Sequence, residues 1–285
     1  MKPIAIPIRA VGPGSQPTSD HELALLEMPR EMPAFEMPAV PHQADPRDRR
    51  EAAALIDRVI EALERYRVGA PDYPSIDVAG LSAAALDALN QALGEGEVSA
   101  VIQRPEPMEI QETVFAGVWR VRSLDAEGRV AVDRIEVCDI PAAVTRAAAA
   151  AWGPDLPERP WPAGVMNAPM LLKEIAAHAR DYRPGSAPHV VNLTLLPLSP
   201  VDQTLLAQTL AEGGVTLLSR GFGKCRITST VLANAWWVRY FNSVETLILN
   251  TVEVGGVPEV AKAAQDDLDD SAARLRELAE WLREE

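Results

Sequence analysis

The amino-acid sequence predicts an α+β protein that consists of two tandem duplicated units, each an antiparallel β-meander packed with helices. The first observation is a long internal repeat: residues 187–258 align with residues 70–141 without a gap, and about 20 of roughly 72 aligned positions are identical. The second is the run 221–242, which is rich in the β-branched and aromatic residues that strands favour. The third is the helical spacing of apolar residues that precedes each repeated stretch.

The repeat predicts four segments along the chain. They are an extended, methionine- and proline-rich N-terminal arm at 1–46, repeat unit 1 at 47–152, a proline-rich linker at 153–166, and repeat unit 2 with a long C-terminal helix at 167–285. The arm repeats the triplet Glu-Met-Pro from Glu27, Glu31 and Glu36. It is either a disordered leader or an arm whose methionines and Phe35 lie in a groove of the folded part.

Each unit is expected to begin with a helix, a short strand and a second helix. Residues 47–66 have the apolar spacing of an amphipathic helix, with a counterpart near 171–182. Ser82 and Ser199 each stand where an N-cap is expected. Gly96 and Gly213 stand where a left-handed C-cap is expected, because glycine adopts positive φ at low cost.

Three strands are then expected in sequence, at 97–103, a long apolar run, and 129–137, with a matching set in the second unit. The long run would span about 50 Å if it were straight. Gly117 and Asn234 occupy the same place in the two copies, and both residue types tolerate positive φ, so we predict a bulge or tight bend there.

Pro141 and Pro258 are expected to open the closing helices. The second closing helix should reach the C-terminus, with an apolar stripe of roughly heptad spacing. This stripe is expected to pack on the sheet of its own unit, and the alternative is a homodimer contact.

Composition and charge exclude several classes of function. The net charge of −14 would repel a nucleic-acid backbone and acidic membranes, so neither partner is expected. Cys138 and Cys225 form no CxxC pair, so neither a disulfide framework nor a zinc motif is predicted. The N-terminus lacks a signal-peptide core, and no run of residues is long and apolar enough to cross a membrane. A soluble, cytoplasmic protein is expected.

The tryptophans and Cys225 are the first candidates for special roles. Trp119 and Trp236 match between the copies and are expected in the core, whereas Trp237 is matched by Arg120. Trp237 is therefore either an interface residue or part of a second core layer. Cys225 lies between Lys224 and Arg226, and these cations could lower its pKa and make it a reactive thiolate or an iron ligand. The alternative is a small buried hydrophobe.

The remaining polar residues predict no catalytic centre and no cofactor. Arg122 and Arg239 recur with Glu136 and Glu253, which suggests cross-strand ion pairs. The histidines at positions 21, 42, 178 and 189 show no metal-ligand spacing. No nucleophile–base arrangement is visible. The residues alone therefore favour a binding protein over an enzyme.

Several motifs resemble the hydrogenase expression/formation proteins of the HupH/HyaF family. They are Gly-Lys-Cys-Arg-Ile-Thr-Ser-Thr at 223–230, Trp-Trp-Val-Arg-Tyr-Phe-Asn at 236–242, Leu-Asn-Thr-Val-Glu-Val at 249–254, Ile-Gln-Glu-Thr-Val-Phe-Ala-Gly-Val-Trp-Arg-Val at 110–121, and the Met-Pro leader. The resemblance implies an accessory protein for maturation of uptake [NiFe]-hydrogenase in the cytoplasm. It implies as partner the iron–sulfur small subunit before export, or another hydrogenase accessory protein.

The resemblance carries no established catalytic residues, metal or cofactor. The positions that we expect to contact a partner are Cys225, Arg226, Trp237, Arg239 and Asn242. Two mechanisms are open at this point. The protein is either a chaperone that shields apolar surface of an immature subunit, or a thiol-dependent factor that uses Cys225 to deliver or repair an iron–sulfur cluster. A single thiol would need other ligands from a dimer or a client.

Overall fold

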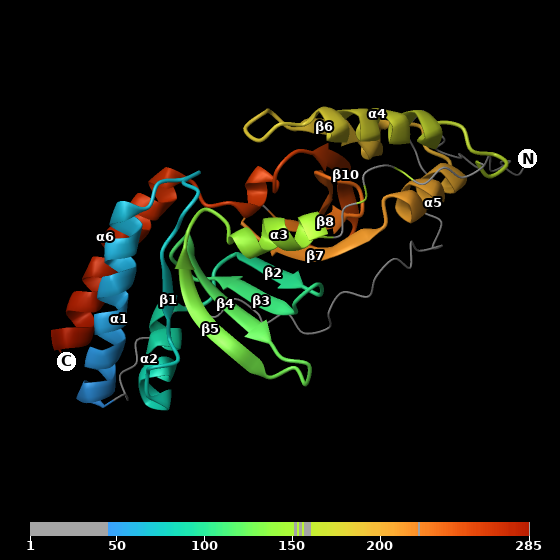
Figure 1. Ribbon diagram of the computed structural model, residues 1–285. Coiled ribbons are helices and arrows are strands. Elements are labelled where there is room, and N and C mark those ends of the chain that lie inside the picture. Colours follow the sequence, from blue (N-terminus) through green and yellow to red (C-terminus); the bar gives the residue numbers. More distant parts are fainter. Residues whose placement is uncertain (1–44, 151–152, 154–155, 157–160, 222, 285) are drawn as a thin grey trace, which may run out of the picture. The chain divides into compact units, whose positions relative to one another are not determined.

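One antiparallel sheet of ten strands organises the part of the chain that the computed structural model describes, which comprises residues 45–150, 153, 156, 161–221 and 223–284 (Figure 1). The α+β class is confirmed. The N-terminal arm and most of the linker lie outside these residues, so the predictions made for them are not tested. The segment boundaries and the duplication also stay predictions.

The strand order is β1-β5-β4-β3-β2-β7-β8-β9-β10-β6, and every neighbouring pair is antiparallel. The strands are β1 Ser75–Asp77, β2 Val98–Ile102, β3 Met108–Glu112, β4 Val118–Leu124, β5 Val130–Val137, β6 His189–Asn192, β7 Glu212–Ser219, β8 Lys224–Thr230, β9 Ala235–Phe241 and β10 Leu247–Val254. The two halves of the chain thus contribute five strands each, in the same relative order outward from β2 and β7.

The helices of the described residues are α1 Pro46–Arg65, α2 Ala83–Leu93, α3 Ala142–Ala150, α4 Ala168–Asp181, α5 Pro200–Thr209 and α6 Gln265–Glu284, with short 3-10 helices η1 Leu193–Leu195 and η2 Glu259–Ala261. Both predicted serine caps are confirmed. Ser82 Oγ accepts from Ala85 N at 3.0 Å, and Ser199 Oγ accepts from Asp202 N at 3.1 Å. Each serine thereby satisfies a donor that the first helical turn leaves unpaired.

The junction between β2 and β7 makes the sheet continuous. Val98 pairs with Ser219, Ala100 with Leu217, and Ile102 with Val215. Ala100, Leu217 and Val215 are buried, so apolar contacts support this ladder of hydrogen bonds.

The expectation of three consecutive strands after the second helix of each half is wrong, because the long apolar run is two strands. It reverses at the predicted bends, where Gly117 has φ 80° and Asn234 has φ 58°. Equivalent hydrogen bonds tie each reversal to the residue that follows β5 or β10: Cys138 N donates to Gly117 O at 3.0 Å, and Gly255 N donates to Asn234 O at 2.7 Å. A tight turn thus replaces a strand that would be too long for the sheet.

The predicted C-caps at Gly96 and Gly213 are also wrong. The C-cap of α2 is Gly94, which has φ 56°, and the C-cap of α5 is Leu210. Gly96 instead allows close approach of two backbones, because a Cβ there would lie 2.1 Å from the carbonyl oxygen of Thr113. Gly213 has the same relation to Thr230, at 2.6 Å. Both glycines serve packing and not helix capping.

The closing helix of the second half differs from its expected position. Pro258 opens only the short helix η2, and α6 begins at Gln265. Helix α6 packs along α1, a helix of the first half, and the two lie side by side in Figure 1. The ion pairs Arg276–Glu64 and Arg283–Asp57 join them. The expectation that this helix packs on the sheet of its own half is therefore wrong.

The apolar stripe of α6 is used within the chain. Leu268, Leu275 and Leu282 are buried in the larger hydrophobic core, together with residues of α1 and of the first half of the sheet. These leucines are therefore not exposed for the homodimer contact that the heptad spacing had suggested.

Trp119 and Trp236 are fully buried, as expected from their match between the halves. Their indole nitrogens differ in environment. Trp119 Nε1 donates to Cys138 O at 2.9 Å, whereas Trp236 Nε1 is buried without a hydrogen-bond partner among the described residues. Also within those residues, no helix has the length and apolar content needed to cross a lipid bilayer.

The different environments of the two indole nitrogens predict that replacing each tryptophan with phenylalanine destabilises the protein to a different extent. Trp119→Phe should destabilise the protein more than Trp236→Phe, by about 1–2 kcal/mol, because only the first leaves the buried carbonyl of Cys138 without its donor. Urea denaturation of both variants measures the difference. Each variant is the control of the other, and equal losses would contradict the prediction.

Candidate functional site

Cys225 is a buried, free thiol on the central strand β8. Burial raises its pKa to about 11, although a hydrogen bond with Tyr240 lowers it in part. The expectation that Lys224 and Arg226 lower this pKa is wrong, because successive residues of a strand point to opposite faces of the sheet. The thiol is therefore protonated near neutral pH.

Arg226, Trp237 and Arg239 share the other face of the same strands. Arg226 lies directly opposite Arg239 in the β8–β9 ladder, and the Arg239 guanidinium carbon is 4.6 Å from the centre of the Trp237 ring. Trp237 Nε1 donates to Asn250 Oδ1 at 2.6 Å. Trp237 is 7% exposed and packs in a second core with residues of α4 and α5, as its core-layer alternative predicts.

The two arginines concentrate positive charge at one point of the sheet. Burial and the neighbouring Arg226 lower the pKa of Arg239 to about 10, against an opposing effect of Glu212. Arg226 Nε is buried without a hydrogen-bond partner among the described residues. Arg226 is itself buried and Arg239 is half-buried, so Arg239 is the more accessible of the two charges, and contact with a partner at these residues stays a prediction.

Asn242 shapes the turn between β9 and β10. Its Oδ1 accepts from Val244 N at 3.0 Å and from Thr246 N at 2.9 Å, and its backbone N donates to Thr246 O. This is the local hydrogen bonding for which asparagine is favoured in turns. Asn242 thus has a structural role, and its predicted partner contact is not tested.

The cross-strand pairs expected for Arg122 and Arg239 are not formed as predicted. Glu136 pairs with Arg134, at 2.6 Å, and Arg122 faces Asp133, at 3.9 Å. Arg120 and Asp133 form a closer ion pair. Arg122 and Glu136 belong to opposite faces of the sheet, and this alternation decides the partners.

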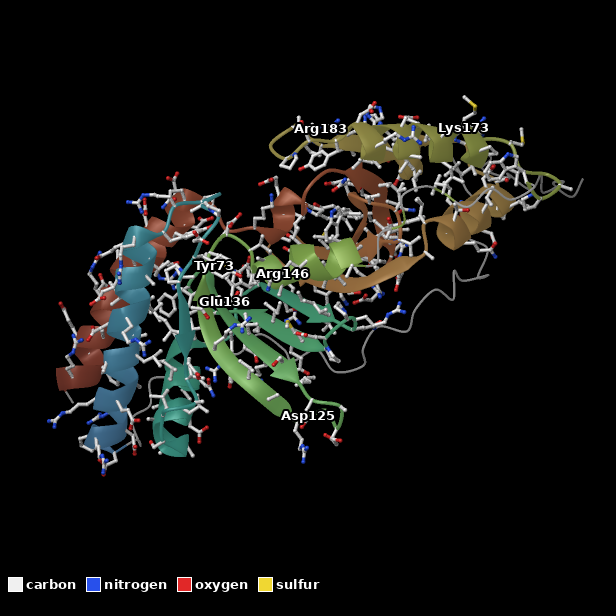
Figure 2. The ribbon with its side chains drawn as sticks, in the orientation of Figure 1. Tyr73, Asp125, Glu136, Arg146, Lys173 and Arg183 are labelled. Atoms are coloured by element: carbon white, nitrogen blue, oxygen red, sulfur yellow. The ribbon has the colours of Figure 1, made fainter. Side chains whose placement is uncertain are left out.

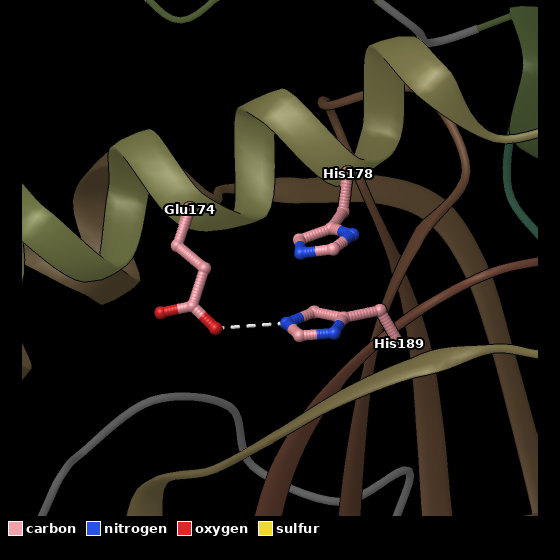
Figure 3. A group of neighbouring side chains, drawn as sticks. All are labelled: Glu174, His178 and His189. Carbon is pink, nitrogen blue, oxygen red and sulfur yellow. Dashed lines mark hydrogen bonds and ion pairs between the residues drawn. The ribbon is translucent and has the colours of Figure 1, made fainter.

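The structure brings together three potential metal ligands that the sequence analysis missed: Glu174, His178 and His189 (Figure 3). Glu174 Oε1 is 2.8 Å from His189 Nε2, and the rings of His178 and His189 stack with centroids 3.5 Å apart. Glu174 and His178 are one helical turn apart on α4, and His189 begins β6. The Glu-x-x-x-His spacing was visible, but its third member is distant in sequence.

Apolar side chains are exposed where α4 and α5 begin. We call Met166, Met170 and Val201 the α4–α5 apolar patch; Met166 is 73% exposed and Met170 is 68% exposed. The buried carboxylate of Asp202 holds the two helix starts together, since it accepts from the backbone of Met166, Asn167 and Ala168. Exposed apolar clusters of this kind often mark binding surfaces.

Figure 2 labels Glu136 of β5 and Tyr73, which lie near each other in the first half. Glu112 of β3 is a buried carboxyl whose pKa lies near neutrality. Burial raises its pKa to about 7, although Gly117 N donates to Oε1 at 3.1 Å and opposes the rise. The position matches Ser229 in the other half, so the fold itself does not require a carboxyl there.

The raised pKa of Glu112 predicts that the free energy of unfolding falls as the pH rises. Its folded pKa is above the ordinary value of 4.5, so its contribution is fully present below pH 4.5 and is lost as the pH rises through about 7. Glu112→Gln should therefore gain stability over the wild type between pH 4.5 and 8, by at most about 3 kcal/mol.

Urea denaturation at several pH values measures this gain. Glu109→Gln is the matched control, since Glu109 is exposed on the same strand and should show no such pH dependence. A constant difference between Glu112→Gln and the wild type across this range would contradict the prediction.

Comparison with known proteins matches the chain to hydrogenase expression proteins. The family model described as the HupH hydrogenase expression protein, C-terminal conserved region, matches residues 49–151 and again residues 165–282. The hydrogenase expression/formation protein HoxQ of Azotobacter vinelandii is 47% identical over 278 residues, which cover 95% of each chain. The corresponding HupH of Rhodobacter capsulatus is 40% identical and covers 98% of each chain.

A solved structure, that of the hydrogenase expression protein HupH from Thiobacillus denitrificans, aligns with 39% of this chain and 92% of its own at 29% identity, with a TM-score of 0.36. The family match and the two relatives together cover nearly all of the sequence, which confirms the resemblance seen in the motifs. The chain therefore belongs to the HupH family of hydrogenase expression proteins.

Proposed function

We propose that the chain is an accessory protein for maturation of uptake [NiFe]-hydrogenase, and that it acts as a chaperone on the iron–sulfur small subunit before export. The observation that carries this proposal is the similarity to hydrogenase expression/formation proteins over almost the full length of both chains. Action in the cytoplasm, on this subunit or on another accessory protein, is part of the proposal.

The α4–α5 apolar patch supports a binding role. Exposed methionine adapts its shape to irregular apolar surface, which suits a client that has not finished folding. Met166 and Met170, together with Val201 at the start of α5, supply such surface. The half-buried Arg239, with Arg226 behind it in the ladder, adds positive charge for an acidic group of the client. Binding, and not catalysis, is the proposed activity.

The alternative function, delivery or repair of an iron–sulfur cluster by Cys225, has less support. A cluster ligand must lose its proton, and burial raises the pKa of this thiol to about 11. Cys138 is also buried, and burial raises its pKa too. Four ligands usually hold a cluster, and two buried cysteines do not supply them.

The two halves are proposed to descend from one duplicated unit, with boundaries at 47–152 and 167–285. Three observations support this origin: the identical residues of the ungapped alignment, the matching strand order outward from β2 and β7, and the two separate matches of one family model. Divergence between the copies, as at Arg120 and Trp237, would then leave one half to bind the client.

Cys225→Ala separates the two mechanisms. We expect hydrogenase activity to be retained in cells that make only this variant, because a buried, protonated thiol contributes packing and not chemistry. Hydrogenase activity and small-subunit binding are measured together. Lost activity with intact binding would support the cluster mechanism instead.

The double variant Met166→Ser, Met170→Ser should weaken capture of the small-subunit precursor at least about tenfold, since an interface that loses its buried apolar anchors typically loses 1–2 kcal/mol or more. Pull-down of the precursor with the purified chain measures the loss. Val130→Ser, Val132→Ser is the matched control, because these valines are also exposed but lie on β5. Equal capture by both variants would contradict the patch as the binding surface.

A further inference from the structure

We propose that Glu174, His178 and His189 bind a divalent transition-metal ion such as Zn²⁺ or Ni²⁺. The three side chains come from α4 and from the edge strand β6, and Figure 3 shows the Glu174 carboxylate beside His189 and the His178 ring lying over the His189 ring. The inference rests on this geometry and not on the proposed chaperone function.

The donor set selects the class of metal. Two imidazole nitrogens and one carboxylate oxygen suit zinc, nickel and neighbouring transition metals. Calcium and magnesium prefer sites made of oxygen ligands only. The site is therefore expected to discriminate against Mg²⁺ and Ca²⁺.

The distances are close to those that a bound ion needs. One ligand atom from each residue lies within 4.8 Å of the other two. Metal–nitrogen bonds of about 2.1 Å allow two donors on one ion to be at most about 4.2 Å apart. Glu174 and His178 are exposed and His189 is half-buried, so small side-chain rotations suffice to close the difference.

The backbone that carries these residues is held in place by the core. Ile175 and Ala179, which follow Glu174 and His178 on α4, are buried in the second core. His189 pairs with Val254 of β10, which is also buried. Ligands on anchored elements lose little freedom when the ion binds.

The ion pair between Glu174 and His189 accounts for the position of those two side chains but not for that of His178. The His178 ring stacks on the His189 ring with an interplanar angle of 9°. A rotation of the exposed His178 side chain would turn the in-plane nitrogen lone pairs of both rings toward one ion. Three protein ligands leave at least one position open for water or for a side chain of a partner.

Metal titration of the full-length, untagged chain tests the site. After treatment with a chelator, the wild type should bind one Zn²⁺, and in a separate experiment one Ni²⁺, by calorimetry. His178→Ala, His189→Ala in one chain should weaken each affinity at least about tenfold, the scale seen when even outer partners of a metal site are removed. Glu174→Gln should weaken it less, since an amide oxygen remains.

The control removes the other two histidines of the sequence, as His21→Ala, His42→Ala, and should keep the wild-type affinity. X-ray absorption of the zinc complex should show nitrogen and oxygen ligands with imidazole scattering and no sulfur. Circular dichroism of the metal-free variants checks their folding, which exposed substitutions should not alter.

Three results would overturn the proposal. They are absence of binding to the wild type, equal affinity after loss of His178 and His189, and loss of binding in the control that lacks His21 and His42.

Discussion

The pairing of β2 with β7 is the interaction on which the rest of the structure depends. Val98–Ile102 and Val215–Ser219 are distant in sequence, yet their ladder turns two five-stranded sheets into one. Each strand would otherwise be an unpaired sheet edge at the centre of the molecule, with backbone donors and acceptors open to other chains. Because Ala100 and Leu217 are buried at this ladder, the joined sheet also supports a core that reaches across it.

Helix α6 makes the two halves interdependent in a second way. It follows the last strand of the second half but contributes Leu268, Leu275 and Leu282 to the core around α1. A Cβ at Gly117 would lie 2.7 Å from Leu268, so the first-half turn and this helix fit each other closely. The halves are therefore alike in strand order and unlike in helical cover. Any surface that only one of them offers, such as the start of α4 and α5, is a consequence of that difference.

The candidate residues show how burial decides chemistry. Cys225 stands between two cations in the sequence and Trp237 between two apolar residues, and the structure buries the first in the larger core and the second in the second core. The thiol is protonated and the indole donates to Asn250, so both side chains have a packing role within the protein. Exposed methionines and the Glu174, His178 and His189 group are the reactive or adaptable features at the surface of the described residues.

The sequence by itself determined what short-range physics controls. The serine caps, the strand alternation and the reversals at Gly117 and Asn234 depend on a few neighbouring residues, and the family motifs are contiguous. Only the tertiary structure decided the β2–β7 pairing, the place of α6 on α1, the raised pKa of Cys225 and the approach of His189 to α4. Each of these depends on contacts between residues far apart in the chain, where spacing along the sequence carries no information about distance in space.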